Sequence, residues 1–273
     1  MLVPFFTAHR RRKLLSKPLD ESAERTLAEE VGVYKRLPDA AKSKLRDFAR
    51  VLVAEKNWEP CGPLRSSGLS TNTKLAIAAQ AGVLLLGLGL DPLRDELYPN
   101  VESVLVYPAG FVSSGARAVA PVGPVAIISE DFTNIGEAWH QGPVILSLAD
   151  ARRGGLGGAA SGGQNVVIHE FAHKLDMLDG AVNGTPILES REQLADWKSV
   201  MTGEFIELSR AAALGVPTVL NTYGATNPGE FFAVATEAFF ERPVALRAQH
   251  TRLYDTLMGY YKQDPAAWTR GAA

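Results

Sequence analysis

The chain has 273 residues and a formal net charge of −2, with a sequence pI of about 6.2. This length can bury a substantial core in one large domain or in two closely packed ones. The near-neutral charge argues against direct nucleic-acid binding and against a general acidic-membrane partner. The single cysteine, Cys61, cannot form an internal disulfide, and no stretch resembles a signal peptide. A cytoplasmic location is therefore expected.

The first third of the chain is predicted to be helical. Apolar residues recur at helical spacing in residues 21–33, 38–56 and 73–86. The apolar run at residues 75–90 is interrupted by Gln80 and by glycines, so it predicts a buried core helix and not a membrane span. The basic cluster at residues 10–13 is local, and we expect it to be a solvated segment.

Short runs typical of β-strands follow, and then helical patterns return. The strand-like runs are residues 101–107, 125–129 and 144–148. The later helical patterns are residues 165–178, 190–213, 228–240 and 243–261. This order predicts an α+β fold, with a helical N-terminal region over residues 1–90 packed on a core over residues 91–273. In that core, helices are expected to flank a small mixed sheet.

Residues 169–173 read His-Glu-Phe-Ala-His, directly after an apolar run. On a helix, imidazoles at positions i and i+4 lie on one face, so both can reach a single metal ion. Glu170 points elsewhere on the helix and is placed to hold a water molecule. A chance match occurs in about one chain per hundred of this length. Three polar groups in an apolar helix are costly to bury without a metal, however, so the pattern favours a zinc site with Asn165 as the helix cap.

The glycine-rich stretch at residues 154–163 lies just before this helix. It lacks the Lys-Ser/Thr ending of a phosphate-binding loop. We expect a mobile loop, either as a flap near the substrate or as a simple flexible connection.

A catalytic zinc ion usually takes a third protein ligand and leaves one position for water. Position 179 is Asp, so the pattern with a third His six residues downstream fails. A carboxylate from a later helix is therefore expected, and Glu230 and Glu237 share one face of an apolar helix. For Glu230 the alternative is a capping interaction with Asn227, three residues earlier.

Three further residues are candidates for the surroundings of the metal. Asp176 and Glu237 could each orient an imidazole, although a salt bridge would explain either one. His140 could line the substrate cleft, although a histidine beside a tryptophan is more often structural. The strand at residues 144–148 could pair with an extended peptide along its edge, or it could be a simple core strand.

Several motifs spread over residues 30–245 resemble one known family. The most specific are His169-Glu-Phe-Ala-His-Lys-Leu-Asp176 and the segment at residues 223–237. The other matching stretches are residues 37–38, 77–81, 98–108 and 142–147. Together they resemble the Mlc titration factor A family of zinc metallopeptidases, whose metal helix is similar to that of the anthrax lethal factor catalytic domain.

The resemblance implies a zincin-like fold and a gluzincin-like site that binds one zinc ion per chain. His169, His173 and Glu230 would be the ligands, Glu170 the general base, and Tyr223 would face the substrate and stabilise the oxyanion. On residue type alone, a packing tyrosine explains Tyr223 as well. Thermolysin-like enzymes carry Asp or Ser four residues after the ligand Glu, where this chain has Val. Support for an imidazole must therefore come from another position.

The resemblance also implies two functions. The first is peptide hydrolysis, with aminopeptidase-type action on a peptide substrate. The second is the binding of a transcriptional repressor such as Mlc, with proteolysis secondary, because the founding member of the family binds that repressor. An intact Glu170 favours the first function, since a purely structural zinc site needs no general base.

Overall fold

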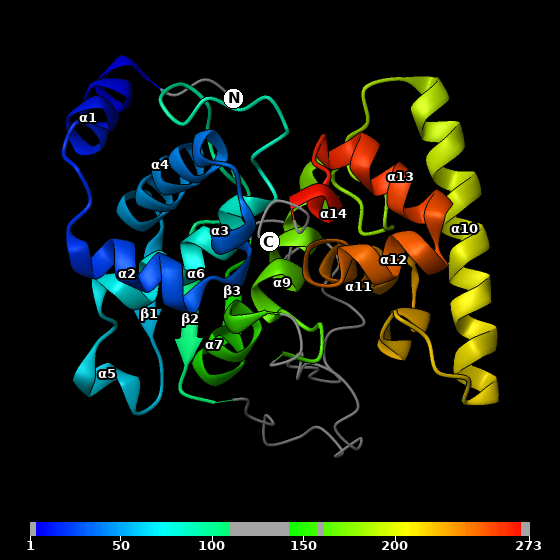
Figure 1. Cartoon of the computed structure of the whole chain (residues 1–273). Coiled ribbons are helices and arrows are strands. Elements are labelled where there is room, and N and C mark those ends of the chain that lie inside the picture. The colour runs from blue at the N-terminus through cyan, green and yellow to red at the C-terminus, as the bar shows by residue number, and fades with distance from the viewer. Residues whose placement is uncertain (1–3, 110–141, 158–160, 269–273) are drawn as a thin grey trace.

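The structure is a computed structural model that describes residues 4–109, 142–157 and 161–268. In the view of Figure 1, the N-terminal helices and a small sheet lie on the left, and the C-terminal helices α10, α12 and α13 lie on the right. Helix α9 (Val166–Asp176), which carries residues 169–173, lies between them (Figure 1). One hydrophobic core runs through both sides, from Ala23 to Ala266. The predicted α+β architecture is therefore confirmed.

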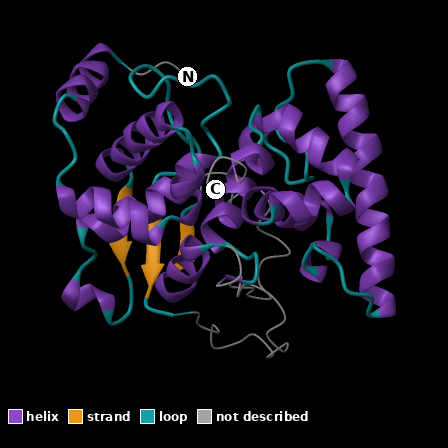
Figure 2. Cartoon of the chain, in the orientation of Figure 1, coloured by secondary structure: helices purple, strands orange, loops and turns teal. Residues whose placement is uncertain are grey.

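The sheet contains three parallel strands within the described residues (Figure 2). They are β1 (Asn57–Pro60), β2 (Ser103–Tyr107) and β3 (Val144–Ser147), in the order β1-β2-β3. The described strands are parallel, whereas we expected a mixed sheet. Helices connect β1 to β2 as the crossover that a parallel pair requires. The sequence predicted β2 and β3 but not β1. The predicted strand at residues 125–129 lies outside the described residues.

Helices of the N-terminal part build much of the core. They are α1 (Phe5–Leu15), α2 (Glu21–Glu30), α3 (Gly32–Arg36), α4 (Asp39–Glu55), α5 (Leu64–Ser67) and α6 (Thr71–Val83). Every residue of α6 from Leu75 to Val83 is buried, which agrees with the predicted core helix. The helix predicted at residues 21–33 is divided at Val31. There Gly32 lies so close to another helix end that a Cβ on it would be 2.6 Å from the Leu156 carbonyl oxygen.

The basic cluster at residues 10–13 lies in α1, where Arg10, Arg12 and Lys13 are exposed as expected but Arg11 is buried. Arg11 is 1% exposed. Its Nε and Nη2 donate to the two carboxylate oxygens of Glu55 at 2.8 and 2.6 Å, and its Nη1 donates to the carbonyl oxygens of Pro92 and Asp95. A guanidinium that is satisfied in this way can be buried at little cost. The prediction is therefore wrong for Arg11, which attaches α1 to the rest of the fold.

The remaining helices follow β3. They are α7 (Leu148–Leu156), α9, α10 (Arg191–Leu214), α11 (Pro228–Glu241), α12 (Pro243–Gln249), α13 (Thr251–Tyr261) and α14 (Pro265–Trp268), with the 3-10 turns η2 (Met177–Asp179) and η3 (Thr222–Ala225). The glycine-rich stretch begins inside α7 and not in a loop, and Gly154 and Gly155 are buried there. The helix predicted at residues 243–261 is interrupted at His250, whose imidazole binds Glu204 of α10 at 2.7 Å. Among the described helices, none combines the length and apolarity that a membrane crossing requires.

Candidate metal centre

Helix α9 is fixed at its first turn by Asn165, which contacts α11 as well as its own helix. The Asn165 Oδ1 accepts the N–H groups of Val167 and Ile168, each at 3.1 Å. Its backbone N–H donates to Glu237 at 2.6 Å, and its side-chain amide donates to Glu241 at 3.0 Å. The cap predicted from sequence is therefore also a clamp between α9 and α11. This clamp sets how the two helices face each other at the centre.

Three side chains from these helices converge on one point. The Nε2 atoms of His169 and His173 are 3.2 Å apart. The Oε2 atom of Glu230 lies 3.0 Å from His169 Nε2 and 3.5 Å from His173 Nε2. Ligands about 2.0–2.1 Å from a tetrahedral zinc ion are separated by roughly 3.3 Å. The three separations fit that geometry, and within the described residues these are the three side chains that could hold a metal ion.

The carboxylate of Glu230 faces the imidazoles and not the start of its own helix. The cap of α11 is made by Asn227, whose side chain accepts the Glu230 N–H at 2.9 Å. Burial raises the pKa of Glu230, but the hydrogen bonds and charges of His169 and His173 outweigh burial and hold this pKa far below its ordinary value. Glu230 is therefore a carboxylate anion aimed at two imidazoles.

His169 lies between two carboxylates. Its Nδ1 is 2.8 Å from Glu237 Oε1, and its Nε2 faces Glu230. Burial lowers the pKa of His169, but hydrogen bonds to Glu230 and Glu237 outweigh burial and raise this pKa well above its ordinary value. The two carboxylates therefore favour a cation at this position. A metal ion fits the same position if Nδ1–H donates to Glu237 and leaves the Nε2 lone pair directed at the centre.

Asp176 does not support an imidazole in this way. Its two carboxylate oxygens accept the backbone N–H groups of Gly184 and Thr185 at 2.9 and 2.7 Å. Within the described residues it has no hydrogen bond to His169 or His173, and the buried Nδ1 of His173 has no partner. Asp176 therefore holds the segment that follows α9 through the backbone N–H groups of that segment.

Tyr223 and Glu170 lie beside the three converging side chains. The Tyr223 ring centroid is 6.1 Å from that of His169, and Asn221 caps the turn by accepting the Tyr223 N–H at 2.9 Å. Burial, the charges of Glu230 and Glu170, and a hydrogen bond to Glu230 raise the pKa of Tyr223. The phenol therefore keeps its proton at neutral pH. The half-buried Glu170 is close enough for its charge to act on both Tyr223 and His169.

The sequence did not reveal the second half of the Asn165 clamp. Glu241 is 5% exposed and lies one turn after Glu237 on the same apolar helix. A third acid in this helix was the available signal. His140, the predicted cleft residue, lies outside the described residues. The predicted docking strand is present as β3, and Lys174 of α9 donates to the Gly142 carbonyl oxygen beside it at 2.8 Å.

Comparison with known proteins gives one family and a set of bacterial relatives. The family described as glucose-regulated metallo-peptidase M90 matches residues 5–262. The protein slr2042 of Synechocystis is 34% identical over 96% of this chain and 91% of its own length. Mlc titration factor A of Salmonella agona is 32% identical over 70% of both chains. Mlc titration factor A of Escherichia coli O127:H6 is 30% identical over 84% of this chain and 82% of its own.

Proposed function

Because the chain belongs to the glucose-regulated metallopeptidase family M90, we propose that it is a zinc peptidase whose reaction centre is formed by His169, His173 and Glu230. The observation that supports this best is the spacing of 3.0–3.5 Å among the three ligand atoms. Two neutral imidazoles and one carboxylate match the usual donor set of a catalytic zinc site. We propose one ion per chain and Glu237 as the residue that orients His169.

Zinc bound by these residues would supply a Lewis acid that lowers the pKa of a water molecule and polarises the peptide carbonyl. Glu170 would accept the proton of the attacking water and deliver it to the leaving amine. Tyr223 would donate its phenolic hydrogen to the developing oxyanion, which the raised pKa of this group permits. The two roles require Glu170 and Tyr223 to be near each other, which the effect of the Glu170 charge on the pKa of Tyr223 supports.

The substrate would be a peptide that lies along β3. This strand is at one end of the order β1-β2-β3 within the described residues, and it packs against α9. An extended peptide added at the edge of β3 away from β2 would be held by main-chain hydrogen bonds, with little demand on side-chain identity. We propose aminopeptidase-type action as the finer activity.

The relatives named Mlc titration factor A support a second candidate function. Their name describes titration of a regulator. We propose that this chain could likewise bind a transcriptional repressor in the cytoplasm, with hydrolysis secondary. Neither candidate requires direct contact with nucleic acid.

Metal analysis combined with two substrate panels tests the peptidase. Purified protein is expected to contain one zinc per chain and to cleave members of a panel of amino-acid p-nitroanilides or of internally quenched peptides. The Glu230→Ala variant is expected to lose zinc. The Glu170→Gln variant should keep zinc and lose hydrolysis, whereas binding of a repressor should survive this change. Hydrolysis by Glu170→Gln at the parent rate would refute the mechanism.

A further inference from the structure

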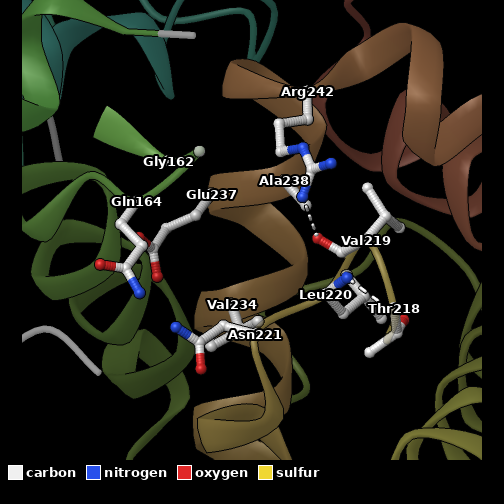
Figure 3. A pocket seen from close by; sticks show the side chains of 11 residues that line it. Gly162, Gln164, Thr218, Val219, Leu220, Asn221, Val234, Glu237, Ala238 and Arg242 are labelled. Carbon is white, nitrogen blue, oxygen red and sulfur yellow. Dashed lines mark hydrogen bonds between the residues drawn. The ribbon is translucent and has the colours of Figure 1, made fainter. Parts of the chain in front are cut away.

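A cavity of about 190 Å³ is lined in part by Glu237 (Figure 3), whose carboxylate also contacts His169 of the metal centre. Its wall is formed by the last turns of α11, by the loop before η3 and by the segment that leads into α9. Figure 3 shows Gln164 and Glu237 on one side, and Arg242 and Val219 on the other. The cavity is outside the group of proposed zinc ligands, and the proposed mechanism does not use it.

The cavity wall is rich in hydrogen-bond donors. Its carboxylate, Glu237, already accepts from His169 Nδ1 and from the Asn165 N–H, one with each oxygen. One N–H of the Arg242 guanidinium donates to the Val219 carbonyl oxygen at 3.1 Å, and the guanidinium has four other N–H groups. The Asn221 side-chain oxygen accepts the Tyr223 N–H of its own turn, and Asn221 lines the cavity. Both oxygens of Glu237 are occupied, whereas the Arg242 guanidinium and the side-chain amides of Gln164 and Asn221 can donate to the acceptor oxygens of a carboxylate guest.

The position of Arg242 is fixed by the glycine beneath it. A Cβ on Gly163 would lie 2.3 Å from Arg242 Cδ, and Gly163 has a φ of +83°. The aliphatic part of Arg242 therefore lies directly on the backbone of the segment before α9. The hydrogen bond to Val219 holds the guanidinium end. An arginine side chain that is held at its aliphatic part and at its guanidinium can form a paired hydrogen-bond contact with little further loss of conformational freedom.

We propose that this cavity is a subsite for a substrate carboxylate, which rests on the proposed peptidase function. Glu237 follows the proposed ligand Glu230 by seven residues, or about 10 Å along α11. An extended peptide covers that distance in about three residues. The carboxylate is therefore the free C-terminus of a short peptide, or an Asp or Glu side chain, two or three residues from the cleaved bond.

Peptides that differ in one group test the subsite. Three peptides share the cleaved bond: one ends in a free acid, one ends in an amide, and one ends in an amide but carries Asp at the third residue. The wild-type protein is expected to show a kcat/KM about tenfold higher for an acidic peptide than for the neutral amide. The Arg242→Gln variant should bring this ratio close to one, and Arg242→Lys should retain part of it. The matched control is Arg210→Gln, an exposed arginine of α10 whose loss should leave the ratio unchanged.

The two acidic peptides distinguish the source of the carboxylate. A preference for the free acid alone assigns the subsite to a chain terminus, and a preference for the Asp peptide alone assigns it to a side chain. Equal rates for all three peptides in the wild type, or an unchanged ratio in Arg242→Gln, would overturn the proposal. Thermal unfolding shows whether each variant is folded.

A binding experiment separates this proposal from the peptidase proposal. The acid and amide forms of an acetylated tripeptide are titrated into the zinc-loaded Glu170→Gln variant by calorimetry. The acid is expected to bind about tenfold more tightly, and the Glu170→Gln, Arg242→Gln double variant should lose this difference. Equal binding of the two forms would overturn the subsite even if hydrolysis is observed. If the acid form binds more tightly but the wild-type protein hydrolyses none of the peptides, the subsite is supported and the peptidase proposal is refuted.

Discussion

Glu237 orients His169 through one contact, and we expect this contact to control the zinc affinity of the centre. Its Oε1 is 2.8 Å from His169 Nδ1, and its side chain is 4% exposed. In Glu237→Gln the carboxamide is a weaker acceptor, and its amide hydrogens would face existing donors. We predict a loss of about 10- to 100-fold in zinc affinity, measured by titration against a chromophoric chelator. The matched control is Glu207→Gln, since this side chain is 64% exposed and pairs with Arg210. Equal affinities for the two variants would contradict the role of Glu237.

Tyr223 is predicted to affect the rate of peptide hydrolysis and not the binding of zinc. Its raised pKa keeps the hydroxyl protonated at neutral pH, so it can donate to an oxyanion. Tyr223→Phe is therefore expected to lower kcat by about 100-fold, or roughly 3 kcal/mol, with zinc content retained. The same change at Tyr34, whose hydroxyl contacts Glu24 far along the chain from the centre, should leave kcat unchanged. A Tyr223→Phe variant with the parent kcat would make this residue a packing tyrosine.

The local spacing of residues 169–173 was enough to predict α9 and its two imidazoles. Glu237 was predicted as a partner because it shares an apolar helical face with Glu230. Asp176 could not be assigned correctly, since its partners are backbone N–H groups that only the fold brings to it. Arg11 was misassigned because clustered charges are usually solvated, whereas here a distant Glu55 satisfies the guanidinium.

At the scale of elements, Asn165 links α9 to α11 as well as capping α9. The stability that this link adds can be measured by comparison with a residue that is only a cap. Asn165→Ala removes the cap of α9 and also leaves Glu241 without its amide donor. The matched control is Ser190→Ala, which removes a cap of α10 at an exposed end. We predict a loss of about 1 kcal/mol for Ser190→Ala and at least twice that for Asn165→Ala, measured by chemical unfolding.

Only the joint at Asn165 should also affect the metal. Zinc affinity is expected to fall in Asn165→Ala and to remain unchanged in Ser190→Ala, because the Asn165 side chain ties the start of α9 to Glu241 of α11, and both helices carry proposed ligands. Equal destabilisation of the two variants, with equal zinc affinity, would show that Asn165 is a cap and nothing more.

Elements stabilised by local patterns were predicted more closely than elements that depend on distant partners. Helix α10 was predicted at residues 190–213 and is observed at Arg191–Leu214, because its periodicity and its cap are local. Strand β1 was missed, since its four residues include Asn, Glu and Pro and pair with a strand beginning at Ser103. Helix α7 was missed because two adjacent glycines disfavour a helix, yet both are buried against other elements.

At the scale of the whole molecule, the centre couples metal binding to stability and pH. The pKa of His169 is raised, so its contribution to stability is complete below its unfolded value of about 6.5 and is lost as pH rises through the folded value. The pKa of Glu230 is lowered, so its contribution is present above about 4.5 and is lost as pH falls through the folded value. The metal-free protein should therefore be most stable between these two limits.

Bound zinc should abolish the loss of stability at alkaline pH, because the ion replaces the proton at the centre. In chelator, we predict that Tm falls as pH rises above about 6.5, whereas with zinc at 1,000 times its Kd the protein gains about 4 kcal/mol and the fall disappears. Differential scanning calorimetry at several pH values, with and without zinc, measures both curves. Their difference isolates the centre, since other titrating groups contribute equally to each. Parallel curves from pH 6 to 9 would show that His169 does not exchange a proton for the metal.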